Sequence, residues 1–156
     1  MEQTAGVRVP PPLYYLGGLA VGFAIEAIVG GPLFPRHAAP GYWLVPGAAL
    51  ITVGLVLCAS AIVMVRRSGS SIRPDRPTTA LVVRGPYRWT RNPMYVGLAI
   101  LSAGIAVVAN ALWPLLMLIG VLGIVRRRVI AREEAYLEQA FGREYRRYCD
   151  RVPRWL

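Results

Sequence analysis

The stretch RGPYRWTRNPMYVG, residues 84–97, places a Gly-Pro pair, three arginines and a helix start directly before a long apolar run. Asn92 and Pro93 suit the N-cap and the first position of a helix. The apolar run covers residues 94–125. A single helix of that length would far exceed a hydrocarbon core of about 30 Å, since a helix rises about 1.5 Å per residue. We therefore expect two shorter helices that form a hairpin with its turn near Asn110.

Two more apolar blocks precede this stretch, at residues 13–31 and 41–65, and each is long enough for a spanning helix. Hydrophobic residues make up 55% of the 156 residues, more than an ordinary water-soluble domain carries. The expected fold is all-α, a polytopic membrane bundle of about four transmembrane helices with a cytoplasmic C-terminal helical cap. Its single domain, 1–156, divides into two transmembrane helices (1–65), a cytoplasmic loop (66–93), the helical hairpin (94–125) and the cap (126–156).

The basic residues indicate the orientation in the membrane. All 18 of them are arginines, against 8 acidic residues, and the net charge is +10. Arginines cluster on both sides of the apolar run 94–125, and the positive-inside rule assigns both clusters to the cytoplasm. Both termini and the loop with Arg73 are then expected inside, and His37 outside. Because the arginines border apolar segments, we expect membrane lipids as partners and no nucleic acid.

Several isolated residues need no functional site to explain them. Cys58 and Cys149 are expected to be free thiols, and His37 has no partners for a metal site. Glu26 lies in the first apolar block, where reaching to the outer interface is its expected behaviour. It also opposes the alternative that this block is a cleaved signal peptide with Arg8 in its charged region.

A second polar segment follows the hairpin. Glu133 and Glu134 come directly after a basic patch, and such a pair could hold an ammonium group. The alternative is ion pairing within their own helix, for example between Glu134 and Arg127 or Arg128. The start of a helix at Pro93 offers free N–H groups to a carboxylate or phosphate, or is only a capped membrane helix.

Aromatic residues recur near the C-terminus. Tyr145, Tyr148 and Trp155 could wall an adenine or a lipid chain. Equally, they could dock the tail on the membrane surface, as aromatic residues at membrane interfaces often do.

Together these segments resemble the isoprenylcysteine carboxyl methyltransferase family and its phospholipid methyltransferase relatives. The first signature is similar to the family's Gly-Pro-Tyr followed by Arg-His-Pro-x-Tyr-x-Gly, here at residues 85–87 and 91–97. The second is similar to EExxL at 133–137, FGxxYxxY at 141–148 and PRW at 153–155. The likeness covers residues 79–156, about half of the chain.

The resemblance implies an integral membrane methyltransferase that uses S-adenosylmethionine at the cytoplasmic face. Glu133 and Glu134 would take the methionine ammonium, and Arg91 or Arg154 would orient an anionic substrate. The catalytic set implied is Arg91, Asn92 and Arg154. The cofactor would be lined by Gly85, Pro86, Tyr87, Asn92, Tyr95, Gly97, Glu133, Glu134, Leu137, Tyr145, Tyr148 and Trp155, with no metal.

One position departs from the family pattern. Asn92 stands where the family has His, and an amide cannot take a proton near neutral pH. A carboxylate or thiolate acceptor needs no base, whereas an ammonium acceptor must first lose a proton. This favours methyl transfer to a carboxylate of a lipophilic or prenylated substrate over phospholipid N-methylation.

The alternatives to this function come from two other classes. The C-terminal signature is also related to that of membrane sterol reductases, which use NADPH, and a non-enzymatic lipid-binding membrane module would account for the arginines. The compact length resembles bacterial members, so we expect a bacterial inner membrane location, where prenylated CaaX proteins are not expected. The sequence leaves the oligomeric state open.

Overall fold

The computed structural model describes residues 9–35, 39–69 and 80–155. The expectations for Arg8, His37 and Arg73 concern positions outside the described residues. Within these ranges the regular elements are helices, and an isolated β-bridge joins Pro32 to Ala111. The all-α fold class is therefore confirmed.

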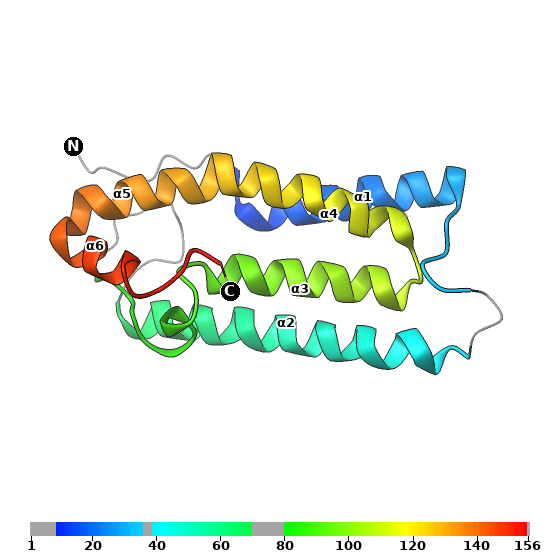
Figure 1. Cartoon of the computed structure of the whole chain (residues 1–156), viewed down its shortest axis with the longest axis horizontal. Coiled ribbons are helices and arrows are strands. Elements are labelled where there is room, and N and C mark those ends of the chain that lie inside the picture. Colours follow the sequence, from blue (N-terminus) through cyan, green and yellow to red (C-terminus); the bar gives the residue numbers. More distant parts are fainter. Residues whose placement is uncertain (1–8, 36–38, 70–79, 156) are drawn as a thin grey trace.

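Four long helices run side by side along the molecule (Figure 1). They are α1 (Pro11–Val29), α2 (Gly41–Arg67), α3 (Pro93–Val108) and α4 (Leu112–Val125). Both α1 and α2 are long and apolar enough to cross a membrane, by length and composition. At 16 and 14 residues, α3 and α4 are shorter than the roughly 20 residues of an independent span. The helix α2 also extends to Arg67, slightly beyond the boundary predicted at residue 65.

The predicted hairpin turn at Asn110 is confirmed. Asn110 lies between α3 and α4 with φ at 51°, a left-handed conformation that asparagine tolerates better than most residues. Its side chain accepts a 2.7 Å hydrogen bond from the backbone N–H of Phe34 and donates one of 3.2 Å to the Phe34 carbonyl. The turn is thereby tied to the chain that leaves α1.

Glu26 has a structural role that the sequence did not reveal. Its carboxylate Oε2 accepts hydrogen bonds from the backbone N–H groups of Leu112, at 3.0 Å, and Trp113, at 3.2 Å. These N–H groups begin α4, where a helix has no internal acceptors and favours a negative charge. The expectation that Glu26 reaches to the outer interface stays a prediction, and within the bundle α1 uses Glu26 to cap α4.

Glycines allow α2 and α3 to pack closely. A Cβ on Gly54 would lie 2.6 Å from the backbone nitrogen of Leu101, and one on Gly97 would lie 2.6 Å from Cys58 Sγ. Both distances are far below van der Waals contact. Gly97 therefore faces α2 and serves helix packing, and its place in the cofactor lining that the family resemblance implied stays a prediction.

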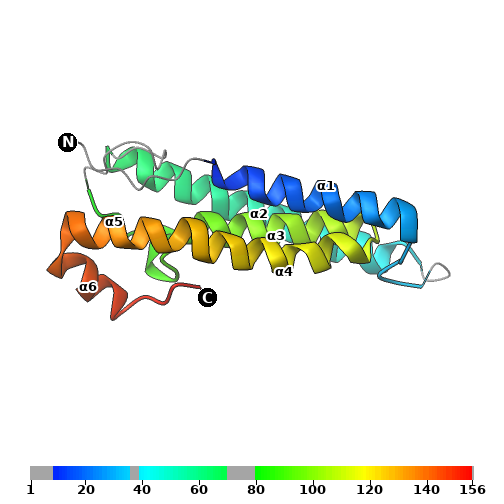
Figure 2. The ribbon, with the colours of Figure 1, turned by 90° about the horizontal axis from the view of Figure 1, so that it is seen from above.

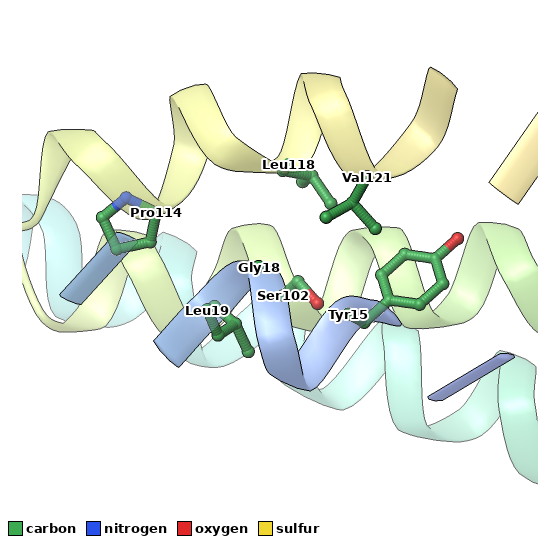
Figure 3. A pocket seen from close by; sticks show the side chains of 7 residues that line it. All are labelled: Tyr15, Gly18, Leu19, Ser102, Pro114, Leu118 and Val121. Carbon is green, nitrogen blue, oxygen red and sulfur yellow. The ribbon is translucent and has the colours of Figure 1, made fainter. Parts of the chain in front are cut away.

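On the other side of the bundle, α1 packs against α3 and α4. Figure 3 shows the crevice between them, which is too narrow to admit a water molecule. Its lining is almost entirely apolar and comes from Tyr15, Gly18, Leu19, Ser102, Pro114, Leu118 and Val121. This part of the bundle is therefore a packed core.

Beyond α4 the helix continues without a break. The π-helical turn η2 (Arg126–Ile130) joins α4 to α5 (Ala131–Phe141), and the three form one rod in both views (Figures 1 and 2). Gly142, with φ at 51°, ends α5, as its position in the sequence indicated. The short helix α6 (Arg143–Cys149) then turns back, and the C-terminal segment ends beside the start of α3 (Figure 1).

Candidate functional site

The two sequence signatures meet at the start of α3. The backbone N–H of Arg91 donates a 2.9 Å hydrogen bond to the Pro153 carbonyl. The Arg154 carbonyl accepts two more, each of 3.0 Å, from Thr90 Oγ1 and Asn92 Nδ2. Residues that lie about 60 positions apart in the sequence are thus fastened together. The C-terminal segment forms a strap across the helix start.

Asn92 occupies the N-cap position of α3, as predicted, but its side chain does not cap the helix. The amide is directed to Arg154 instead, and the backbone N–H of Asn92 donates to Thr90 Oγ1 at 3.2 Å. The prediction that the side chain of Asn92 caps α3 is therefore wrong. Pro93, at the first helical position, needs no acceptor because it lacks an N–H group.

Glu134 holds two guanidinium groups. Arg154 contacts it with two nitrogens, Nε at 2.9 Å from Oε1 and Nη2 at 2.5 Å from Oε2. Arg91 Nη1 lies 3.3 Å from Oε1. The Glu134 side chain is 15% exposed, so these pairs are shielded from water. The alternative pairing of Glu134 with Arg127 or Arg128 is wrong, because Glu134 joins α5 to the helix start and the strap.

Glu133, the neighbouring carboxylate, has a different environment. Its Oε1 accepts a 2.6 Å hydrogen bond from the hydroxyl of Tyr95. Among the described residues it forms no ion pair. Burial raises the pKa of Glu133 to about 7, the hydrogen bond from Tyr95 opposes the rise, and the charge of Glu134 adds to it. A desolvated carboxylate without a cation is poised to accept one.

The charges at this site also affect the groups around it. The hydrogen bond to Glu134 raises the pKa of the Arg154 guanidinium above its already high value. Burial, with the nearby charge of Glu133, raises the pKa of the Tyr87 hydroxyl. Tyr87 belongs to the short helix η1 (Gly85–Arg88). The first signature therefore lies close to both carboxylates of the second.

The predicted aromatic wall is a packed cluster. Tyr145 and Tyr148 are 4% and 5% exposed and pack with Val152, against which Leu137 and Phe141 lie. The Tyr148 hydroxyl donates a 2.7 Å hydrogen bond to the Tyr87 carbonyl. Trp155 belongs to a second cluster, with Tyr15 and Tyr95. These side chains support the strap from both sides.

The remaining predicted residues divide between the site and the scaffold. Gly85 begins η1 with φ at 61° and is exposed, and Pro86 beside it is buried. Two residues of the site were missed from the sequence. Thr90 fastens the strap, and Cys149 Sγ accepts a 2.7 Å hydrogen bond from Arg91 Nη1. Thr90 lies between the two parts of the first signature, and Cys149 directly follows Tyr148. Their positions beside signature residues could have identified both as residues of the site.

The site combines groups that suit a ligand of mixed charge. Glu133 offers a half-buried carboxyl group, and two guanidinium groups lie at the neighbouring Glu134. Arg91 Nε is buried and has no hydrogen-bond partner among the described residues, and such an orphaned donor is costly unless a ligand supplies an acceptor. Both cysteines are free thiols, as predicted. Among the described residues there is no cluster of three or more metal-binding side chains.

Comparisons with known proteins agree with the two signatures. The phospholipid methyltransferase family model matches residues 42–144. The protein-S-isoprenylcysteine O-methyltransferase B of Arabidopsis thaliana is 34% identical over 133 residues, which cover 83% of this chain and 65% of the relative. A probable protein-S-isoprenylcysteine O-methyltransferase of Oryza sativa subsp. japonica is 31% identical over 86% of this chain and 72% of the relative.

A bacterial relative is shorter. An uncharacterized protein of Haemophilus influenzae is 47% identical over 64 residues, which cover 40% of this chain and the whole of that protein. This chain spans about two thirds of the length of the plant relatives. From the family model and these identities together, the chain belongs to the phospholipid methyltransferase family, as the resemblance of its signatures predicted.

Proposed function

We propose that this chain is an integral membrane methyltransferase that transfers the methyl group of S-adenosylmethionine to a lipophilic acceptor. Family membership supports the reaction class. The observation that carries the proposal is Glu133, a half-buried carboxylate held by Tyr95 without a counter-cation among the described residues. S-adenosylmethionine brings positive charge as an ammonium and a sulfonium, and its carboxylate suits a guanidinium.

The two carboxylates then have separate roles. Glu133 accepts the ammonium group of the cofactor, while Glu134 is already engaged by Arg91 and Arg154 and positions them. Arg91 Nε, which is buried and unpartnered, suits the carboxylate of the methionine moiety. The bound cofactor supplies a methyl group on a sulfonium, ready for an in-line displacement. The protein contributes mainly by holding donor and acceptor in line, because correct positioning alone lowers the barrier of such a transfer substantially.

The acceptor is a carboxylate on a lipophilic chain. Two guanidinium groups near the start of α3 suit an anionic end group, and a carboxylate needs no base to react. The plant relatives carry the name of an isoprenylcysteine O-methyltransferase. The family description favours a second candidate, a phospholipid amine. Asn92→His would restore a proton acceptor, so it should increase methyl transfer to amines more than to carboxylates.

The bundle crosses a bacterial inner membrane four times. In this arrangement α3 and α4 form the second pair of spans, with the rod continuing through η2 so that Arg126, Arg127 and Arg128 stand at the inner interface. Cysteine labelling in intact cells, on a background without Cys58 and Cys149, tests this. A cysteine at Leu33 should react with an impermeant maleimide, and one at Ser68 should react only after lysis. Labelling of Ser68→Cys in intact cells would refute the orientation.

Calorimetry on the purified protein tests the cofactor directly. S-adenosylhomocysteine should bind to the parent and to Glu138→Gln, a control whose carboxylate is 54% exposed. Glu133→Gln should weaken binding roughly 10- to 100-fold, the equivalent of about 1.5–3 kcal/mol for a charge-assisted hydrogen bond. Binding of NADPH in place of S-adenosylhomocysteine would point to a reductase, and binding of neither to a lipid-binding module. Labelled methyl transfer into extracted lipids then identifies the acceptor class.

A further inference from the structure

We infer that the π-helical turn η2 sets the rotational register of α5 and thereby positions both site carboxylates. The inference rests on the proposed function only because it takes Glu133 and Glu134 as residues of the cofactor site. The turn covers Arg126–Ile130, and the N–H of Ala131 donates to the carbonyl of Arg126, five residues back. Such single π-turns are rare within helices and are frequently found at functional sites.

The burial pattern shows what the turn does. Val121, Val125 and Val129 recur every four residues, are 7%, 0% and 0% exposed, and face the core with Tyr95. The next residue at that spacing is Glu133, which bonds to Tyr95. In a regular α-helix a four-residue step overshoots a full turn by about 40°, and three steps drift by about 120°. In a regular α-helix this row of buried valines would therefore turn away from α3 before it reached Glu133.

The π-turn corrects this drift. One extra residue in a turn changes the phase of everything after it by about 100°, the rotation per residue of an α-helix. That correction offsets most of the accumulated drift. It also buries two consecutive residues, Val129 and Ile130, both 0% exposed, directly after three exposed arginines. The same rotation directs Glu134 to Arg91 and Arg154.

A deletion and an added insertion test the inference. Deleting Arg127, which is exposed, removes the extra residue that the π-turn accommodates, so the rod should become a continuous α-helix and α5 should keep its phase. Adding one alanine after Ala131 to this deletion restores the residue count without the π-turn and should rotate α5 by about 100°. Arg127→Ala is the matched control, since it removes the side chain and keeps the residue count. The readout is crosslinking by a short bismaleimide between cysteines placed at Glu134 and Arg154, without Cys58 and Cys149.

Crosslinking should be efficient in the parent, in Arg127→Ala and in the deletion, and at least tenfold slower when the alanine is added to the deletion. A folded deletion variant that loses crosslinking would overturn the inference, because the π-turn would then not account for the phase of α5. If the deletion does not fold, the alanine insertion alone rotates α5 by about 100° beyond the intact π-turn, and unchanged crosslinking there would overturn the inference equally. S-adenosylhomocysteine binding is measured in the same backbone variants with Glu134 and Arg154 in place. Crosslinking that follows the register, together with a parent protein that does not bind S-adenosylhomocysteine, would reject the proposed function and leave the role of η2 intact.

Discussion

The hydroxyl of Tyr95 donates a 2.6 Å hydrogen bond to the carboxylate of Glu133, which joins the first turn of α3 to the first turn of α5. Tyr95 belongs to the first sequence signature and Glu133 to the second, and 38 residues separate them. The α3–α4 hairpin carries the chain away and back between them (Figure 2). The hydrophobic hairpin is therefore the device that brings the two polar signatures to one end of the bundle.

The charged form of Glu133 should destabilise the cofactor-free protein, although the same charge is needed to bind the cofactor. Burial places its pKa at about 7, above the ordinary 4.5, so the fold favours the neutral carboxyl. Its stabilising contribution is present below pH 4.5 and is lost as the pH rises through 7. At about 1.4 kcal/mol per pH unit, the loss is roughly 3 kcal/mol. The cofactor-free protein should therefore melt at lower temperature at pH 8 than at pH 5.

Glu133→Gln should remove that pH dependence. The variant should melt above the parent at pH 8 by several degrees, since 1 kcal/mol is about 2–4 °C for a chain of this size, and it should bind S-adenosylhomocysteine poorly. Thermal melts in detergent at pH 5, 6, 7 and 8, with and without ligand, measure both effects. Parallel pH curves for parent and variant would show that Glu133 is not the titrating group.

Glu134→Gln should have the opposite effect on stability. It leaves Arg91 and Arg154 without their shared carboxylate, in a cluster where Glu134 is 15% exposed and Arg91 16%. The cost should be roughly 1.5–3 kcal/mol. Glu138→Gln is the matched control in the same helix, because its pair with Arg146 spans 3.9 Å between exposed side chains and is worth about 0–1 kcal/mol. Equal melting temperatures for the two variants would contradict the structural role of Glu134.

The sequence predicted the helices well and the side-chain contacts poorly, for a physical reason. Apolar runs reveal helices because a spanning segment must be apolar throughout. The turn at Asn110 could be predicted because asparagine tolerates the left-handed backbone conformation that the turn requires. The partners of Glu134 and Asn92 lie 20 and 62 residues away, and no local pattern encodes such distances. The local alternatives, an ion pair within the helix and a side-chain hydrogen bond from Asn92 at the N-cap, were therefore natural predictions but wrong ones.

Residues with two compatible explanations were the hardest to place. Gly97 fits the family signature, but its lack of a side chain is used against Cys58 in α2. The register of α5 depends on a π-turn, which has no sequence pattern comparable to an apolar repeat. Glu26 looked like an isolated charge because the N–H groups that it binds belong to a helix 86 residues further on.

Replacing Glu26 should affect the fold without affecting the site. Glu26→Ala removes the side-chain acceptor of the Trp113 N–H and one of two acceptors of the Leu112 N–H, which also donates to the Gly31 carbonyl at 3.1 Å, and it should cost about 1–3 kcal/mol. Glu26→Gln keeps an acceptor oxygen and loses only the charge, so it should recover most of the stability. Melting temperatures in detergent give the ranking. The S-adenosylhomocysteine affinity of the folded fraction should stay within about twofold of the parent, since Glu26 belongs to the last turn of α1, which lies at the opposite end of the bundle from α5, the helix that carries Glu133 (Figure 1).

Asn92 offers the most specific test of the strap. Its amide Nδ2 donates to the Arg154 carbonyl, which Thr90 Oγ1 also reaches. Asn92→Ala should therefore cost about 1 kcal/mol, the value of one hydrogen bond, because Thr90 keeps the carbonyl satisfied. Asn92→Asp replaces the donor with a charged acceptor facing that carbonyl, and it should destabilise more than alanine does. Asn92→His keeps a donor and should lie near the parent.

Binding then separates a positioning role from direct contact with the cofactor. If Asn92 acts by holding the strap, Asn92→Ala should lose no more than about fivefold in S-adenosylhomocysteine affinity, the equivalent of the same 1 kcal/mol. Thr90→Ala removes the other bond to Arg154 and also the acceptor of the Asn92 N–H, so it should lower the melting temperature more than Asn92→Ala does and lose at least as much affinity. A loss of a hundredfold in Asn92→Ala with Thr90→Ala near the parent would instead make Asn92 a direct ligand. The strap would then be a consequence of the site rather than its support.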